Sequence, residues 1–335
     1  MEPIETGNAA ADIAGNAEHT TADPLVQLAE QIQEQIGKVI VGQHGMTELL
    51  LAGLLADGHI LIEGAPGVAK TLAAKLIARL IKANFSRIQF TPDLMPSDVL
   101  GTNIFNPQSG AFQFKPGPVF SNIILIDEIN RAPAKTQAAL FEIMEERQVT
   151  IDGLTHKLPP PFMVIATQNP IEHEGTYRLP EGQLDRFLMK INVGYPSLEE
   201  EVIILERQNQ QAIIKSLDDV QAIISPEILE NARQMVRKVH IEPKLIEFIA
   251  KITWETRNDR SLYLGASPRA SIALLNVAKA LSVLRGRAFV IPEDIIQAVP
   301  PVLRHRISLT PEREMEGLAP DDVLKEIIAR IEIPR

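Results

Sequence analysis

The sequence contains no cysteine and carries more acid than base. Without cysteine, the chain can form no disulfide, no thiolate metal site and no cysteine nucleophile. The 33 Lys and Arg residues against 43 Asp and Glu residues give a formal net charge of −10. This balance argues against a broad surface for nucleic acid or anionic membrane, because both need clustered positive charge. The net charge does not exclude a local basic groove.

Long apolar runs are also absent. The run Ile123–Ile126 is far shorter than the ~18 residues that a membrane-spanning helix needs. The first residues contain no basic segment followed by an apolar one, so we expect no secretory signal. The histidines show no metal-like spacing, and a zinc site is not expected. These features predict a soluble, cytoplasmic protein without a membrane span.

The length of 335 residues suggests about two domains. Residues 1–23 have almost no bulky apolar side chains, so we expect a flexible tail. Over residues 24–196, strand patterns alternate with helical ones, which predicts a mostly parallel sheet with helices on both faces. Residues 197–335 have helical periodicity and one weak strand signal at Ala288–Ile291. We therefore predict an α/β domain followed by a smaller all-helical domain.

Within the α/β domain, the expected elements follow from apolar patterning. Buried strands are predicted at His59–Glu63, Phe85–Phe90, Ile123–Ile126, Phe162–Ala166 and Phe187–Val193. Helices are predicted at about 25–36, 47–56, 70–82 and 133–147.

Two segments interrupt this alternation. Residues 91–118 mix Pro, Gly, Asn and Ser with Phe105, Phe112 and Phe114, and such a long irregular segment usually signals function or disorder. The sequence from Val149 to Gly153 ends in Asp-Gly and predicts a hairpin.

A phosphate-binding loop is predicted between the first strand and the helix that follows it. Its residues are Gly64, Ala65, Pro66, Gly67, Val68, Ala69, Lys70 and Thr71, and Leu72 continues the helix. The glycines let backbone amides approach an anion, which Lys70 would contact, while the Thr71 hydroxyl would bind Mg²⁺. Ala69 departs from the usual glycine, and alanine tolerates a positive φ poorly. The alternative is a Gly/Pro turn before a helix with a solvated lysine.

Polar side chains follow two other predicted strands. Asp127 and Glu128 come directly after Ile123–Ile126, at the strand end where α/β sheets bind ligands. Asp127 would hold Mg²⁺, and Glu128 would orient and deprotonate the attacking water. Asn169 follows the next strand and could bind that water or a γ-phosphate oxygen. Solvated acids at a strand end and a turn-capping asparagine are the simpler alternatives.

Five sequence motifs follow one another along the chain: GAPGVAKT, IILIDEINRAPAKTQAAL, ATQNP, LPEGQLDRF and GASPRA. In this order the chain resembles the MoxR-type AAA+ ATPases, from about Val41 to Arg306. The family accepts alanine at the position of Ala69. The resemblance implies a P-loop NTPase sheet followed by a helical lid, with ATP or ADP and Mg²⁺ as cofactors. It also implies a homo-oligomeric ring, with six subunits as the expected size and ATP bound between them.

The resemblance also implies roles for individual residues. Val41, Gly42 and Gln43 match the segment near the adenine, and Asn169 matches the sensor of the γ-phosphate. Arg186 matches the arginine finger that reaches the neighbouring subunit's ATP, and Arg269 matches the second sensor on the lid. Arg131 and Arg178 are alternatives to Arg186 as the trans-acting arginine.

The position of Arg269 can also be interpreted from the sequence alone. Ser267 and Pro268 predict a helix start, so Arg269 falls in the first helical turn, where the helix dipole disfavours a cation. This placement hints at an anionic partner. For both Arg186 and Arg269, a surface ion pair is the alternative interpretation.

By resemblance, residues 91–118 correspond to the helix-2 insert of this clade and residues 147–158 to its second hairpin, elements that line the central channel in related rings. The three phenylalanines of the insert could hold a client or pack the insert's own small core. The expected function is an ATP-driven, chaperone-like remodelling of protein complexes, such as maturation or metal insertion, with a separate partner that carries a von Willebrand factor A domain. A nucleic-acid motor, which the acidic charge disfavours, and a nucleotide-dependent switch with little turnover are alternatives.

Overall fold

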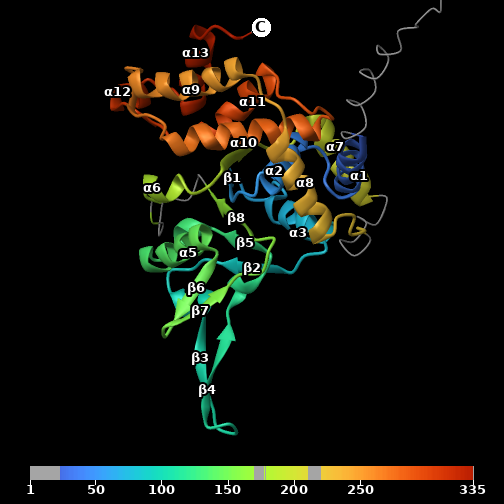
Figure 1. Cartoon of the computed structure of the whole chain (residues 1–335), viewed down its shortest axis with the longest axis vertical. Helices are drawn as coiled ribbons and strands as arrows, with labels where there is room; N and C mark the ends of the chain where they lie inside the picture. The colour runs from blue at the N-terminus through green and yellow to red at the C-terminus, as the bar shows by residue number, and fades with distance from the viewer. Residues whose placement is uncertain (1–22, 170–176, 178, 210–219, 335) are drawn as a thin grey trace, which may run out of the picture.

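The central sheet has five parallel strands in the order β2-β5-β8-β1-β9 (Figure 1). The computed structural model describes residues 23–169, 177, 179–209 and 220–334. The sheet strands are β1 (Ile60–Gly64), β2 (Phe85–Gln89), β5 (Ile123–Asp127), β8 (Met163–Gln168) and β9 (Met189–Val193). All five coincide with the predicted strands to within a few residues, so the predicted parallel sheet is confirmed.

Helices cover both faces of the sheet, because successive strand residues point to opposite sides. On one side, Ile60 and Ile62 pack in an apolar core with helices α2 and α3. On the other side, Leu61 and Ile124 pack with α4 and α5. The helices of this part are α1 (Asp23–Val39), α2 (His44–Leu55), α3 (Lys70–Leu80), α4 (Pro96–Leu100), α5 (Ala134–Glu146) and α6 (Glu181–Leu184), with short 3-10 turns at Pro118–Phe120 and Ile129–Arg131.

Two antiparallel hairpins extend from the sheet domain (Figure 1). The first, β3 (Gly101–Asn106) with β4 (Ala111–Pro116), forms most of the irregular segment predicted at residues 91–118. The second, β6 (Gln148–Ile151) with β7 (Leu154–Lys157), turns at Asp152 and Gly153, whose φ values of 49° and 79° suit a tight two-residue turn. The sequence therefore predicts the second hairpin but not the first, which has no two-residue turn signal.

The first hairpin separates its three phenylalanines. Phe105 and Phe112 pair edge-on at 5.4 Å between ring centroids and are 51% and 71% exposed. Phe114 instead stacks on His156 of the second hairpin at 4.2 Å. The two interpretations left open by the sequence thus divide between residues: one phenylalanine packs and two face solvent.

The lid is a layer of helices at the end of the molecule opposite β3 and β4 (Figure 1). It follows α7 (Leu198–Asn209) and contains α8 (Pro226–Lys238), α9 (Pro243–Asn258), α10 (Pro268–Leu284), α11 (Pro292–Leu303), α12 (Pro311–Met315) and α13 (Pro320–Arg330), with a small ladder of β10 (Leu262–Leu264) and β11 (Ser308–Leu309). The strand predicted at Ala288–Ile291 is wrong, since Phe289 makes only an isolated bridge to His240. Its apolar residues instead lead into α11, and Val290, two residues before that helix, is buried.

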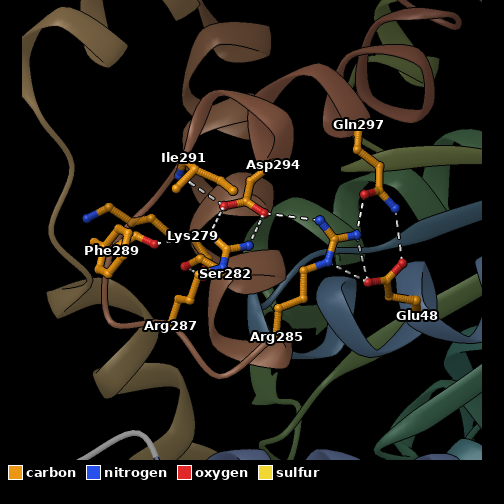
Figure 2. A network of polar contacts seen from close by, with 9 residues as sticks. All are labelled: Glu48, Lys279, Ser282, Arg285, Arg287, Phe289, Ile291, Asp294 and Gln297. Carbon is orange, nitrogen blue, oxygen red and sulfur yellow. Dashed lines mark hydrogen bonds and ion pairs between the residues drawn. The ribbon is translucent and has the colours of Figure 1, made fainter. Parts of the chain in front are cut away.

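A polar network joins the lid to the sheet domain (Figure 2). Arg285, directly after α10, donates to Glu48 of α2 from Nε and Nη2 at 3.0 and 2.9 Å. The same guanidinium contacts Gln297 and donates to the buried Asp294 at 3.1 Å. Asp294 also accepts two hydrogen bonds from Arg287, at 2.6 and 2.7 Å. The lid is therefore fixed to α2 by charge as well as by apolar packing.

Candidate nucleotide-binding site

The phosphate-loop residues connect β1 to α3. Gly67 and Ala69 both have a positive φ, 87° and 62°. Ala69 therefore adopts a backbone conformation that alanine tolerates poorly. Gly64 needs to be glycine for another reason, because a Cβ there would lie 2.6 Å from the Val193 carbonyl oxygen. Lys70 bends back over the loop, and its Nζ donates to the Gly64 carbonyl at 2.5 Å.

Asp127 and Glu128 lie at the carboxyl end of β5, as predicted. Asp127 is buried and accepts from Arg87 Nε at 2.6 Å and from the Thr167 hydroxyl at 3.2 Å. The Glu128 carboxylate accepts from Gln89 Nε2 at 2.7 Å and pairs with Arg131 Nε at 3.1 Å. The Glu128 N–H donates to the Thr167 hydroxyl at 3.1 Å, so Thr167 holds both acids in place.

These groups surround one cavity of about 270 Å³ between the phosphate loop and the strand ends. Its lining residues are Pro66, Gly67, Ala69, Lys70, Thr71, Arg87, Gln89, Asp127, Glu128, Thr167 and Asn169. The structure thus brings the predicted Lys70, Thr71, Asp127, Glu128 and Asn169 together. The side chains of Ala65 and Val68 are instead buried in the core, and Leu72 packs against it.

The cavity suits a magnesium-bound phosphate. The Thr71 hydroxyl and the Asp127 carboxylate both line it, and oxygen ligands are those that Mg²⁺ prefers. In the part of the chain that the structure describes, no group of three or more Asp, Glu or His residues could hold a metal. A magnesium ion here would therefore complete its coordination with phosphate oxygens and water, as it usually does in nucleotide sites.

Three lining residues were missed by the sequence analysis: Arg87, Gln89 and Thr167. Arg87 and Gln89 alternate along β2, a pattern that is visible in the sequence. What places them at the site is the pairing of β2 with β5, which puts Gln89 opposite Asp127. Thr167 follows Ala166 in the predicted strand motif and is the last buried residue of β8.

Comparisons with known proteins identify the family. Residues 59–189 match the profile of the ATPase family associated with various cellular activities (AAA), and residues 255–327 match the AAA lid domain. YeaC from Bacillus subtilis (strain 168) is 46% identical over 312 residues, covering 93% of this chain and 97% of YeaC. Chaperone MoxR1 from Mycobacterium tuberculosis is 43% identical over 330 residues, covering 96% of this chain and 86% of MoxR1.

The chain belongs to the MoxR family of AAA+ ATPases. A crystal structure of a Cytophaga hutchinsonii protein described as a candidate ATPase superposes on this MoxR-family chain with a TM-score of 0.86 and 42% identity. That superposition covers 94% of this chain and 97% of the other. None of the described helices is long and apolar enough to cross a membrane.

In this MoxR-family chain, the segment predicted near the adenine lies in the turn between α1 and α2. Gly42 and Gln43 have positive φ values of 67° and 55°, and Gln43 Nε2 donates to the Gly194 carbonyl at 3.0 Å. Gly42 allows Glu200 of α7 to approach, since a Cβ would lie 2.3 Å from its carboxylate carbon. Val41, Gly42 and Gln43 do not line the phosphate cavity.

The two arginines lie elsewhere. Arg186 Nε pairs with Glu145 Oε2 at 3.1 Å, and Arg269 Nη2 with Glu145 Oε1 at 2.9 Å. Neither arginine lines the cavity that contains Lys70. The anionic partner expected for Arg269 is thus present within the chain. Of the alternative arginines, Arg131 pairs with Glu128 at the cavity, and Arg178 lies outside the described residues, as does the predicted tail apart from Asp23.

Proposed function

We propose that this MoxR-family chain binds ATP with Mg²⁺ and hydrolyses it. The observation that carries the proposal is the single cavity in which Lys70 and Thr71 of the phosphate loop face Asp127 and Glu128. When bound, Mg²⁺ would neutralise charge on the phosphate oxygens. Lys70 would bind the β- and γ-phosphates, and Asp127 and Thr71 would hold the metal.

Glu128 is proposed as the general base. Its carboxylate lies in the same cavity, where it can orient a water and accept its proton. Gln89 holds that carboxylate by a hydrogen bond of 2.7 Å. Asn169 lines the cavity too, so its amide could bind the water or a γ-phosphate oxygen.

The arginines are proposed to act between subunits of a homo-oligomeric ring, with six subunits as the expected number. This proposal is supported by their separation from the chain's own cavity, because Arg186 and Arg269 meet at Glu145 instead. The guanidinium groups would then stabilise the negative charge that develops on a neighbouring subunit's ATP during hydrolysis, and such arginines typically raise the rate by about 10³–10⁵.

We propose a chaperone-like role on protein complexes, including maturation or metal-cofactor insertion. One relative is named Chaperone MoxR1, and another is named a magnesium-chelatase subunit ChlI homolog. The exposed Phe105 and Phe112 at the end of a projecting hairpin are candidate contacts for a protein client. A separate protein with a von Willebrand factor A domain remains the proposed partner.

Two substitutions test the ATPase. Lys70→Ala is expected to abolish ATP binding, because it removes the cation of the phosphate loop. Glu128→Gln is expected to keep ATP affinity and to lower hydrolysis at least about 100-fold, because the amide is no base. Isothermal titration gives the first result and phosphate release the second. Wild-type turnover by Glu128→Gln would contradict the assignment, and stimulation by DNA would favour a nucleic-acid motor.

A further inference from the structure

Glu145 lies between two arginines from different parts of the fold. It belongs to the last turn of α5, whereas Arg186 comes just before β9 and Arg269 from the first turn of α10 in the lid. Each carboxylate oxygen pairs with one guanidinium, at 3.1 Å and 2.9 Å. Two like charges would otherwise repel at this distance, and the carboxylate holds them together with a net charge of +1 on the three groups.

The charges of both Glu145 and Arg269 interact unfavourably with the dipoles of their own helices. An anion is disfavoured in the last turn of a helix and a cation in the first. Glu145 occupies the last turn of α5, and Arg269 the first turn of α10. Their pairing offsets both placements, so the geometry brings these two helix ends and Arg186 together at one point.

The loop that carries Arg186 is also fixed to the lid. The buried Arg306 donates to Asp185 Oδ1 at 2.7 Å and to the carbonyls of Phe187 and Leu188 at 2.6 and 3.0 Å. Ser267, directly before α10, donates to Asp185 Oδ2 at 3.1 Å. Asp185 therefore links the Arg186 loop to the helix start that carries Arg269, so hydrogen bonds join the segments of the two arginines.

The contact with Glu145 engages Arg186 through Nε. Nε shares one edge of the planar guanidinium with a terminal nitrogen, and the remaining N–H groups point away from that edge. A carboxylate at this edge therefore sets the direction of the guanidinium, while a single carboxylate cannot engage all five of its N–H groups.

We infer that Glu145 is a positioning residue, which holds Arg186 and Arg269 as one cationic pair directed at the triphosphate of a neighbouring subunit. The inference rests on the proposed function, because it takes ATP to be bound between subunits. The net positive charge of the cluster suits a polyanion, and Glu145 itself touches no reacting atom.

The test is Glu145→Gln in the full-length chain, with Glu146→Gln as the matched control. Both glutamates are exposed residues of the last turn of α5, and Glu146 has no ion pair with the described residues. Glu145→Gln is expected to lower the kcat for ATP on the order of 10- to 100-fold, the usual result of misplacing a catalytic group by about 1 Å. KM for ATP, affinity for a fluorescent ADP analogue and the urea midpoint should stay unchanged.

Mixed rings separate this role from a merely structural one. Glu145→Gln would damage the arginine side of an interface, and Lys70→Ala would damage the nucleotide side. Mixing the two variants re-creates some interfaces in which both sides are intact, so activity is expected to return above the level of either alone. An unchanged or raised kcat in Glu145→Gln, or no recovery at any mixing ratio, would overturn the inference.

Arg186→Ala, measured alongside, tells this failure from that of the proposed function. If wild-type protein hydrolyses ATP and Arg186→Ala does not, but Glu145→Gln matches wild type, only the role of Glu145 is wrong. If the wild type releases no phosphate, or Arg186→Ala retains full activity, the proposed function is wrong at this interface and the inference is rejected with it.

Discussion

At the scale of single residues, three of the predicted site residues other than glycine adopt a left-handed backbone. They are Gln43, Ala69 and Glu128, with φ values of 55°, 62° and 58°. This conformation costs a non-glycine residue about 1–2 kcal/mol, and such residues cluster at functional sites. For Ala69 and Glu128 the reason is visible, because both line the cavity where the chain turns: Ala69 directly before α3, and Glu128 directly after β5.

Ala69→Gly is expected to leave nucleotide binding intact and to raise the free energy of unfolding by up to about 1 kcal/mol. Glycine removes the left-handed strain, and its larger entropy in the unfolded chain offsets part of the gain. Urea denaturation measures the change. Ala73→Gly is the control, since the same replacement within α3 should lower stability by about 1 kcal/mol. Equal losses in both variants would contradict the argument.

The sequence predicted the charged and polar residues of the cavity that occur in contiguous motifs. Lys70 and Thr71 belong to the phosphate-loop motif after β1, Asp127 and Glu128 lie at the end of β5, and the ends of parallel strands meet at one edge of a sheet. Arg87 could not be predicted in the same way, because only the pairing of β2 with β5 brings it to Asp127. Nor did any local pattern indicate that Glu145 lies beside Arg186 and Arg269, because these three residues come from three separate parts of the chain.

At the scale of elements, apolar runs predicted β1, β5 and β8, since buried parallel strands are nearly continuous in apolar residues, whereas β2 and β9 alternate apolar with polar residues. The same rule misassigned residues 288–291, because a short apolar run before a helix looks like a strand. The hairpin of β3 and β4 was missed for the opposite reason. Most of its side chains face solvent, and β3 lacks apolar alternation. Its four-residue connection contains Ser-Gly, which marks a turn but not the two-residue turn of a tight hairpin.

His59 connects three elements of the core. It directly precedes β1; its Nε2 contacts the Met144 carbonyl of α5 at 3.0 Å, and its Nδ1 accepts the Val164 N–H of β8 at 3.0 Å. The ring is therefore neutral, with its proton on Nε2. Burial lowers the pKa of His59 to about 4, and burial also lowers the pKa of His305, which contacts the Phe187 carbonyl.

These lowered pKa values predict loss of stability in acid. Both histidines bind a proton more readily in the unfolded chain, so their contribution is complete above pH 6.5 and is lost in acid, for His59 as the pH falls toward 4. For His59 alone, the free energy of unfolding should fall by about 2 kcal/mol between pH 7 and pH 5. Urea denaturation at both pH values gives the slope. His59→Gln should reduce this pH dependence, and an unchanged slope would show that His59 does not contribute.

At the scale of the whole molecule, one apolar core extends from the sheet into the lid. It includes Ile62 and Leu50 of the sheet domain together with Leu274 and Val299 of the lid. The Glu48–Arg285 pair lies at the same junction (Figure 2). Because the lid shares this core with one face of the sheet, the lid is expected to unfold together with the sheet rather than as an independent unit.

The single tryptophan tests this expectation. Trp254 lies on α9, so its fluorescence reports on the lid, whereas far-ultraviolet circular dichroism reports on all helices and strands. The two urea transitions of the wild type are expected to coincide. Asp294→Asn should shift both together, by a loss of about 1.5–3 kcal/mol, because it removes the charge of the buried carboxylate that accepts hydrogen bonds from the partly exposed Arg285 and Arg287. Glu48→Gln, which loosens the lid from α2 at a partly exposed pair, should cost less, about 1 kcal/mol. A fluorescence transition that precedes the dichroism transition in the wild type would show instead that the lid unfolds before the sheet domain.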